Sequence, residues 1–308
     1  MKSMQTIAQK TATLVSTLLL LVAVLPIGPA YAGSSSMTAL LPQSSSVKNA
    51  PAGNKAVAQS SRKYYLGFDQ NLYPGDAALP TLMRSFAFTG YWLNAPPGMN
   101  HSEWIGKRSA LKRAGFGFML LFNGRLYREL HNHDAAALGL QDARAALRLA
   151  HEQGFRAPAL LFLDEEEGGR MLPEQLAYIG AWLDGVRAGG FRAGVYCSGI
   201  EVPDGPGQTI STARDLGDHF PGAPLWVAND AAPPSPGCIA KPLPPAKSGV
   251  ATALVWQFAQ SPERRQFTQS SAITYSPDGN CYAPGLTHTL SSALDLDTSS
   301  SPDPSAGR

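Results

Sequence analysis

Four acidic residues follow a strongly apolar stretch in the segment LLFLDEEEGGR, Leu160 to Arg170. Carboxylates packed this closely repel each other and raise one another's pKa. One interpretation is a helix N-terminus, where the positive end of the helix dipole stabilises acidic side chains. The other is a pair of catalytic carboxylates at the end of a buried strand. Because side chains alternate along a strand, Asp164 and Glu166 would share one face and Glu165 would point away from it.

Two carboxyl groups on one face suit glycoside hydrolysis, which needs one protonated carboxyl as general acid and a second carboxylate that stabilises or activates. Like-charge crowding and partial burial keep such an acid protonated near neutral pH. Asp69, which follows the apolar stretch YYLGF, would reach the same place from the first strand. We therefore predict Glu166 as the general acid, with Asp164 and Asp69 as its electrostatic partners. Glu167 is expected to mark the turn before two glycines and to meet Arg170.

The elements that would position these acids alternate between strands and helices. Strand-length apolar segments occupy residues 64–70, 85–94, 116–124, 159–166, 191–199, 224–230, 251–260 and 293–297. Helical patterns precede the third to the sixth of them, at residues 101–115, 142–154, 173–190 and 210–220.

This alternation predicts an α/β fold with a parallel sheet. Eight strands over about 235 residues fit a (β/α)8 TIM-type barrel. We expect the barrel to be irregular in its last third, because Pro-rich connections replace clear helices after Asn229. A doubly wound open sheet is the alternative, although no GxGxxG motif follows the first strand.

Polar and aromatic residues collect at the ends of nearly all the expected strands. In a barrel, the carboxyl ends of parallel strands form the face that holds the active site. We therefore expect a sugar-binding mouth, where flat rings stack on sugar faces. The expected substrate-binding residues are Trp92, Asn123, Tyr196, Trp226, Asn229, Asp230, Trp256, Gln257 and Asp295. For each aromatic residue, a position in the ordinary core is the competing interpretation.

The N-terminal segment has the pattern of a secretory signal. Lys2 and Lys10 precede the apolar run from Leu14 to Pro26, and Ala30-Tyr31-Ala32 forms a small-x-small cleavage site. An uncleaved anchor is the competing interpretation, but the run is short for a membrane span of about 20 residues. The expected division is a signal peptide (1–32), a flexible Ser/Ala-rich linker (33–62), the barrel (63–298) and a disordered tail (299–308).

Composition restricts the partners. The formal net charge is +2 and no basic stripe with interleaved aromatic residues is seen, so nucleic acid is not expected as a partner. We expect an exported monomer, periplasmic or secreted, with no stable membrane anchor after cleavage and no cofactor. No cysteine–histidine spacing suggests zinc. The HxH pair, His131 and His133, is interpreted as part of a solvated loop and not as a metal site.

Export to an oxidising compartment permits a disulfide bond. Cys238 and Cys281 occupy the Gly/Pro-rich segments PPSPGC and PDGNCYAP, which follow the sixth and seventh strands. Those loops would leave adjacent strands on the same face of a barrel, so we predict that the two cysteines are bonded. Cys197 lies within a strand and is expected to be free. It has no evident histidine partner, which argues against a cysteine nucleophile.

Six motifs in this order resemble a family of exported bacterial proteins: GFDQN, FLDEEEGGR, GVYCSG, LWVAND, VWQFAQ and LDLD. That family is described as a glycoside-hydrolase-like TIM barrel of unknown function. It is related to the family 25 glycoside hydrolases, the lysozymes that cut between N-acetylmuramic acid and N-acetylglucosamine. The resemblance spans roughly residues 64 to 297.

The resemblance implies that Glu166 is the general acid and that Asp164 and Asp69 position the substrate and stabilise the developing charge. It also matches lysozyme positions to Trp226, Trp256, Gln257 and Asp295. The chain departs from the lysozyme pattern at several positions. Asn71 replaces a common serine, Asn229-Asp230 replaces a common aromatic residue, and Glu165 and Glu167 add charges.

Our first hypothesis is an exported glycoside hydrolase that acts on peptidoglycan or another polysaccharide by carboxylate acid catalysis. The alternative is a non-catalytic carbohydrate-binding barrel of the cell envelope, and a third class is an exported hydrolase or scaffold of another kind. Retention of Asp69, Asp164 and Glu166 favours the first hypothesis, because a binding site has no need for a buried acid. Loss of the lysozyme aromatic residue favours the second.

Overall fold

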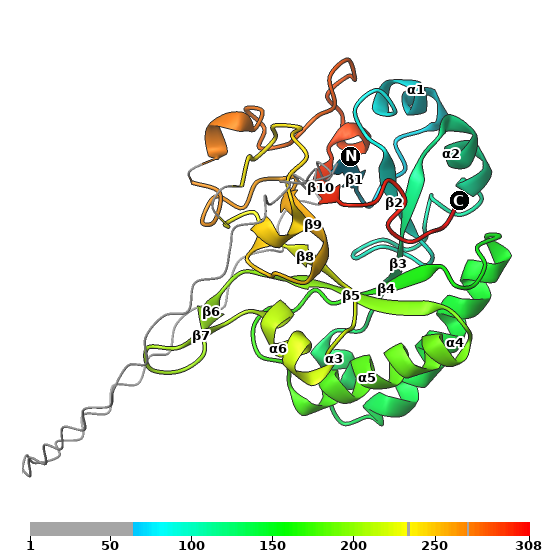
Figure 1. Cartoon of the computed structure of the whole chain (residues 1–308), viewed down its shortest axis with the longest axis vertical. Helices are drawn as coiled ribbons and strands as arrows, with labels where there is room; N and C mark the ends of the chain where they lie inside the picture. Colours follow the sequence, from blue (N-terminus) through cyan, green and yellow to red (C-terminus); the bar gives the residue numbers. More distant parts are fainter. Residues whose placement is uncertain (1–63, 233–234, 270) are drawn as a thin grey trace, which may run out of the picture. The chain divides into compact units, whose positions relative to one another are not determined.

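The computed structural model describes residues 64–232, 235–269 and 271–308, so the expected signal peptide and linker lie outside the described residues. Eight strands close into a barrel in the order β1-β10-β9-β8-β5-β4-β3-β2 (Figure 1). Together with the helices, this barrel confirms the expected α/β, TIM-type fold. The barrel strands are β1 (Tyr65–Asp69), β2 (Phe88–Trp92), β3 (Gly117–Asn123), β4 (Leu160–Asp164), β5 (Arg192–Ser198), β8 (Leu225–Ala228), β9 (Ala253–Ala259) and β10 (Asp295–Ser299). A separate two-stranded hairpin pairs β6 (Val202–Pro203) with β7 (Thr209–Ile210).

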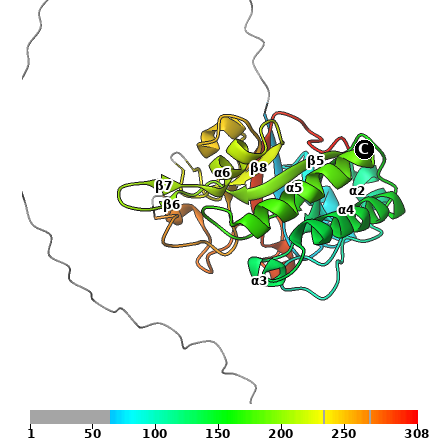
Figure 2. The same cartoon turned by 90° about the horizontal axis from the view of Figure 1, so that it is seen from below.

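The helices lie mainly on one side of the barrel. They are α1 (Leu79–Leu82), α2 (Arg108–Ala114), α3 (Tyr127–Leu130), α4 (Ala135–Glu152), α5 (Pro173–Ala188) and α6 (Thr212–His219). The two longest, α4 and α5, run side by side in both views (Figures 1 and 2). Gly139 permits this close approach, because a Cβ atom there would collide with the carbonyl oxygen of Tyr178 on α5. Asp134 begins α4 by accepting a hydrogen bond from the Ala137 backbone N–H at 3.0 Å.

The barrel has two unlike halves. Strands β2 to β5 are parallel and alternate with helices, and we call them the helix-covered half. Strands β8 to β10 form the loop-covered half. The described residues that connect these three strands contain only short 3-10 turns, namely η2 (Pro245–Ser248), η3 (Ala272–Thr274) and η4 (Leu290–Ser292). A further 3-10 turn, η1 (Asp76–Ala78), precedes α1.

The direction of the last strand corrects one expectation. We expected the carboxyl end of every strand at the mouth, but β10 runs antiparallel to both β9 and β1. Its first residue, Asp295, therefore pairs with Asp69, the last residue of β1. An antiparallel strand needs no helical crossover, so the irregular connection after Ala259 returns the chain at the mouth itself.

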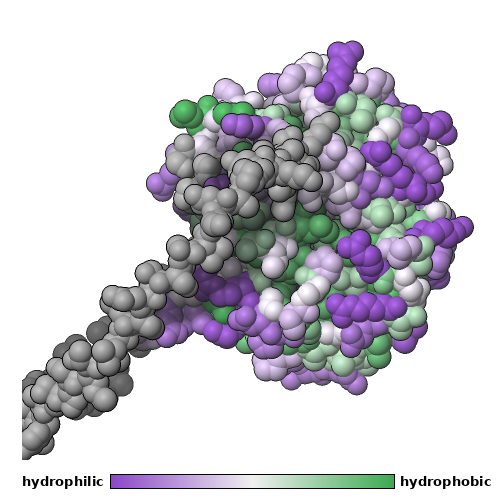
Figure 3. Space-filling view, viewed as in Figure 1, coloured by the Kyte–Doolittle hydropathy of each residue, from purple (hydrophilic) through white to green (hydrophobic). Residues whose placement is uncertain are grey.

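The core fills the barrel and the space beneath the helices. Strands β2 and β4 are buried along their whole length, as expected for strands covered on both faces. The bulkiest buried side chains include Trp104, Trp182 and Trp226. On the face shown in Figure 3, hydrophilic side chains gather toward the rim and apolar ones lie nearer the centre. Among the described residues, no helix combines the length and apolar composition needed to cross a membrane.

The expected disordered tail is instead an ordered strap, residues 300–308, which passes beneath the helix-covered half. The backbone N–H groups of Phe118 and Leu120 donate to Asp303 Oδ1 and Ser305 Oγ at 2.8 and 3.0 Å. The Leu160 N–H donates to the Ser305 carbonyl at 2.8 Å. The strap is held to the strand ends by polar atoms, so its sequence has no periodic apolar pattern from which an ordered segment could be predicted. Gly117 leaves room for it, since a Cβ atom there would meet the backbone of Pro302.

Candidate active site at the barrel mouth

The three acids expected to act together line one cavity of about 210 Å³ at the barrel mouth. Asp69 ends β1, Asp164 ends β4, and Glu166 follows Asp164 by two residues. Asp295 completes the acidic lining from β10. The other lining residues are Asn71, Trp92, Pro97, Leu121, Tyr196 and Gln260. Strand alternation thus places Asp164 and Glu166 on the same side, as the sequence predicts, and Glu165 does not line this cavity.

Asp164 and Glu166 form a carboxyl pair with unequal access to solvent. Asp164 is 3% exposed, whereas Glu166 is exposed at the cavity. Elsewhere in the described residues, neither oxygen of Asp164 meets a hydrogen-bond donor. The side chains contact each other, and because two ionised carboxylates can only accept, this contact is a hydrogen bond only when one of them holds a proton.

Burial is the main reason why the pKa values of Asp164 and Glu166 are raised. It raises the pKa of Asp164 well above its usual range, and repulsion from neighbouring carboxyls, chiefly Glu166, raises it further. Partial desolvation also raises the pKa of Glu166, while the Asp164 contact and the positive charge of Arg264 lower it in part. We expected Asp164 to remain charged and to raise the pKa of Glu166. The structure differs, because Asp164 is the more deeply buried group.

Asp69 belongs to a second carboxyl pair, with Asp297 of β10. Burial raises the pKa of Asp69 to about 6, although hydrogen bonds to Gln257 and Asp297 lower it in part. Gln257 Nε2 donates to Asp69 Oδ1 at 2.8 Å. Burial and the Asp69 charge raise the pKa of Asp297 well above its usual range. Trp226 Nε1 donates to Asp297 Oδ1 at 2.9 Å, so the indole fixes this pair beneath the cavity.

Amide and phenol groups connect the two halves of the barrel across the mouth. Tyr196 of β5 donates its hydroxyl hydrogen to Gln257 Oε1 of β9 at 2.9 Å. Gln260 Nε2 donates to both Tyr196 Oη and Gln257 Oε1, at 3.0 and 2.7 Å. Asp295 accepts from the Ser261 backbone N–H at 2.6 Å. Each acid of the loop-covered half is therefore held by named donors.

Two further cavities extend the acidic cavity into a groove. One, of about 390 Å³, shares Pro97 and Glu166 with it and is lined also by Asn123 and Arg128. The other, of about 330 Å³, shares Asn71 and Asp295 with it. The acids therefore lie midway along a groove that crosses the mouth. Such a groove has space on both sides of the acids.

The structure places only some of the expected sugar-binding residues in this groove. Trp92, Tyr196 and Asp295 line the acidic cavity, and Asn123 lines the cavity beside it. Gln257 is 1% exposed and acts on Asp69 from below.

The remaining four expected residues have structural contacts away from the groove. Trp226 is fully buried against Asp297. Trp256 is also fully buried, on the opposite face of β9 from Gln257, and donates to the Asn229 carbonyl at 2.9 Å. Asn229 binds the backbone of the loop after β8 through both ends of its amide. Asp230 forms a buried ion pair with Arg264. Trp256 is excluded from the mouth because adjacent residues face opposite sides of a strand, whereas Trp226 is excluded because it lies deeper in the barrel, against Asp297.

Sequence reasoning did not select Asn71, Gln260, Asp297 or Arg264 as site residues. Asp297 lies two residues after Asp295 in LDLD, so strand alternation places both on one face, whereas Gln260 lies three residues after Gln257 in VWQFAQ and has no such signal. Arg264 could not be found, because it comes from an irregular loop. Arg264 makes two contacts with Asp230, at 2.5 and 3.1 Å. They place a positive charge near Glu166 and Asp295.

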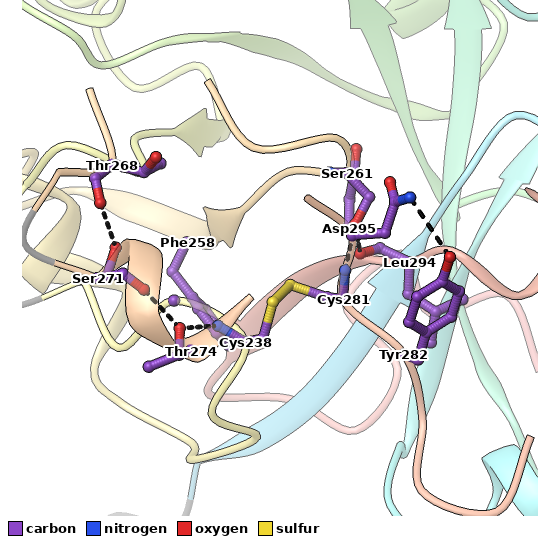
Figure 4. The surroundings of a disulfide bond; sticks show 12 residues. Cys238, Phe258, Ser261, Thr268, Ser271, Thr274, Cys281, Tyr282, Leu294 and Asp295 are labelled. Carbon is purple, nitrogen blue, oxygen red and sulfur yellow. Dashed lines mark hydrogen bonds between the residues drawn. A yellow bond between two sulfur atoms is a disulfide. The ribbon is translucent and has the colours of Figure 1, made fainter. Parts of the chain in front are cut away.

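The loop-covered half is also tied by the disulfide expected between Cys238 and Cys281, which is present with Cα atoms 5.1 Å apart (Figure 4). Thr274 Oγ1 accepts from the Cys238 N–H, and Ser261 Oγ accepts from the Cys281 N–H, each at 2.9 Å. Cys197 is a buried free thiol. In the part of the chain that the structure describes, no group of three or more His, Cys, Asp or Glu side chains is arranged to hold a metal ion.

Comparison with known proteins agrees with the family suggested by the motifs. Residues 104–231 match the family described as the Rv2525c-like, glycoside hydrolase-like domain. The match includes Asp164 and Glu166 but not Asp69 or Asp295. The resemblance to a glycoside-hydrolase-like family is thereby confirmed over residues 104–231, a shorter span than the motifs suggested. Among proteins with curated descriptions, none matches the chain.

Several solved structures resemble this one. An uncharacterised protein from B. stearothermophilus aligns at 18% identity over 76% of this chain and 94% of its own, with a TM-score of 0.49. The Tat-secreted protein Rv2525c of Mycobacterium tuberculosis, in complex with HEPES, aligns at 14% identity over 77% of this chain and 95% of its own, with a TM-score of 0.43. The modular autolysin LytC of Streptococcus pneumoniae aligns at 10% identity over 76% and 46%, with a TM-score of 0.45.

Proposed function

We propose that this protein is an exported glycoside hydrolase that cleaves a cell-wall or other polysaccharide, with Glu166 as general acid. The observation that carries the proposal is the position of Asp69, Asp164 and Glu166 in one cavity midway along a groove. The match of residues 104–231 to a glycoside hydrolase-like domain supports the same class of reaction.

The carboxyl pair supplies the acid. Burial disfavours two charges side by side and raises the pKa of both Asp164 and Glu166, so in this proposal the pair shares one proton. Glu166 is the member exposed to the groove, so it can give this proton to the glycosidic oxygen. Asp164 then remains as a buried anion next to the sugar ring, where it stabilises the positive charge that develops. Asp69 adds a second negative charge from β1.

The groove supplies binding energy on both sides of the acids. Trp92 and Tyr196 line the central cavity, while the amides of Asn123 and Asn280 line its two extensions. These amide-lined extensions also favour a second candidate, a barrel that binds polysaccharide without cutting it. The carboxyl pair distinguishes the two candidates, because binding of neutral hydroxyls does not require a protonated acid.

The test is to incubate the purified protein with peptidoglycan and a panel of polysaccharides and to measure new reducing ends. We expect cleavage of at least one polymer, and a loss of about 10² to 10⁴ in rate for Glu166→Gln. If the wild-type protein is active and Glu166→Gln hydrolyses the polymer at the same rate, Glu166 is not the general acid. Binding of a polymer without cleavage would instead support the second candidate.

Export is a separate part of the proposal. It rests on the basic and apolar N-terminal pattern and the Ala30-Tyr31-Ala32 site. We expect N-terminal sequencing of protein recovered outside the cytoplasm to begin at or near Gly33. A sequence that still begins at Met1 would contradict signal cleavage.

A further inference from the structure

The turn that carries Glu166 is held from outside the barrel by its two acidic neighbours. Glu165 is 3% exposed, and its Oε1 accepts a hydrogen bond from the Glu167 backbone N–H at 2.9 Å. Glu167 Oε2 accepts from the Tyr127 backbone N–H at 2.6 Å and from Gln175 Nε2 at 2.9 Å. The residues on both sides of Glu166 are therefore fixed to the scaffold.

The contacts of Glu167 connect the turn to two different helices. Tyr127 is the first residue of α3, and its neighbours Leu126 and Arg128 line the groove cavity that Glu166 shares. Gln175 lies in the first turn of α5. One carboxylate thus joins the turn that carries the acid, the wall of the groove beside it and a long helix against the barrel.

We propose that Glu167 is a positioning residue, whose carboxylate aims Glu166 into the groove and holds the α3 wall beside it. This inference rests on the proposed function in so far as it takes Glu166 as the general acid. The inference also assigns different roles to the four consecutive acids of LLFLDEEEGGR. Asp164 and Glu166 face the substrate, while Glu165 and Glu167 hold the turn.

The chemistry of the contacts explains why an acceptor is needed at position 167. Gln175 Oε1 already accepts from the Leu172 N–H at 2.9 Å, so its amide presents N–H to Glu167. Both donors meet the same oxygen, Glu167 Oε2. Glutamine at position 167 can place its carbonyl oxygen there and keep both hydrogen bonds, whereas alanine loses both. Gln175→Glu keeps the Leu172 contact but sets a carboxylate against Glu167.

Glu165 contributes in a different way. Burial raises its pKa to about 8, so this side chain is largely uncharged at neutral pH and adds little repulsion to the turn. Its carbonyl oxygen accepts from the Glu167 N–H in either protonation state. Glu165→Gln should therefore preserve the turn.

The first test compares kcat and KM of the full-length protein with those of Glu167→Ala and Glu167→Gln. We expect Glu167→Ala to lower kcat by about 10- to 100-fold, because small misplacements of a catalytic group are costly. KM should rise as well, since the α3 wall moves. Glu167→Gln should restore both values to within about threefold. The control is Asp215→Ala, which releases Met171 and Arg170 at the far end of the same loop and should leave kcat unchanged.

The second test does not depend on hydrolysis. The pKa of Glu166 is measured by carbon NMR of protein labelled at glutamate side-chain carboxyls, with Glu166→Gln identifying the signal. Since desolvation raises the pKa of Glu166, we expect Glu167→Ala to lower it toward the ordinary glutamate value, and Glu167→Gln and Asp215→Ala to leave it unchanged. If Glu167→Ala does not fold, Gln175→Glu should give the same shift.

The outcomes separate the two claims. If the wild-type protein cleaves no polysaccharide but the Glu166 signal shifts in Glu167→Ala, the proposed function fails and the positioning role stands. An unchanged Glu166 pKa in both Glu167→Ala and Gln175→Glu overturns the positioning role. Equal losses of kcat in Glu167→Ala and Asp215→Ala also overturn it, because a general loss of stability would then explain both.

Discussion

The helix-covered half of the barrel, β2 to β5, and the loop-covered half, β8 to β10, hold the carboxyls near the mouth by different means. In the first, apolar strands pack under α4 and α5, and Asp164 and Glu166 stand at the end of β4 with few polar contacts beneath them. In the second, Asp295 and Asp297 of β10 accept hydrogen bonds from an indole, the Gln257 amide and a backbone N–H, and a disulfide ties the adjoining loops. Where helices do not restrain the strands, discrete polar and covalent links take their place.

Removal of the strap, residues 300–308, should have the largest effect on this comparison. It would leave the N–H groups of Phe118, Leu120 and Leu160 without their present acceptors. At about 1–3 kcal/mol for each of these three groups, the loss is about 3–9 kcal/mol, which is comparable to the whole stability of an ordinary domain. Circular dichroism and thermal unfolding of the truncated protein provide the measurement. Removal of Arg308 alone is the control, and a truncated protein of native stability would show that the helix-covered half needs no link to β10.

Loss of the disulfide should have the next largest effect, confined to the loop-covered half. Cys238 and Cys281 close a loop of 43 residues, which stabilises the folded state by about 4 kcal/mol in the chain-entropy model. The double variant Cys238→Ser/Cys281→Ser should therefore unfold at lower denaturant concentration, with faster hydrogen exchange in β8 to β10 than in β3 to β5. Cys197→Ser is the matched control for a cysteine outside the loops. Uniform acceleration of exchange in both halves would contradict the localisation.

Rising pH should destabilise the folded state through the buried carboxyls. Burial raises the pKa of Asp69 to about 6, and it also raises the pKa values of Asp164, Asp295 and Asp297 well above their usual range. The folded state therefore binds protons more tightly than the unfolded chain. The free energy of unfolding should be largest below about pH 4 from these groups and fall as the pH rises through 6. Asp69 alone accounts for up to about 3 kcal/mol.

Urea unfolding between pH 4 and pH 8 measures this dependence. Asp297→Asn is the informative variant, because an amide can still accept from Trp226 and donate to Asp69 without a proton to lose. It should flatten the pH dependence. If the free energy of unfolding of Asp297→Asn depends on pH as strongly as that of the wild type, the protons responsible would belong to the pair of Asp164 and Glu166 in the helix-covered half instead.

Tyr196→Phe should have the smallest effect on stability, about 1 kcal/mol, since it removes one hydroxyl. Gln257 Oε1 keeps its bond from Gln260, but the link between β5 and β9 is lost. Tyr178→Phe is the matched control in the helix-covered half, where Asp142 keeps its bonds from Arg125. Both variants should lose similar stability, and only Tyr196→Phe should reduce polysaccharide hydrolysis. Equal hydrolysis by the two variants would show that the Tyr196 hydroxyl does not contribute to activity.

The elements of the fold follow from the sequence to a large extent, because continuous apolar runs such as LLFLD mark buried strands. The direction of β10 could not be predicted, since ALDLD is short and no helix announces a crossover. The strap could not be predicted either, because Asp303 and Ser305 act through hydrogen bonds that leave no hydrophobic pattern.

At the site, alternation correctly separated Asp164 and Glu166 from Glu165. The same rule, applied to Trp256 and Gln257, would have excluded one of that adjacent pair from the mouth. Arg264 is beyond such rules, because its position depends on a loop held by Asp230 and the nearby disulfide. The expectation that Glu167 meets Arg170 is wrong for a similar reason. Arg170 pairs with Asp204 and Asp215, which come from segments that only the fold brings near.

The reversed direction of β10 has a consequence for engineering. Because β9 ends and β10 begins at the mouth, the segment from Gln260 to Leu294 leaves the barrel and returns to it at the same rim. It can therefore be lengthened, shortened or exchanged as a cassette without rebuilding the base of the barrel. Four residues of the segment must be kept, because they contact residues outside it: Gln260 contacts Tyr196, Ser261 contacts Asp295, Arg264 contacts Asp230 and Cys281 is bonded to Cys238. A library confined to this cassette would vary one wall of the groove while Asp164 and Glu166 keep their scaffold.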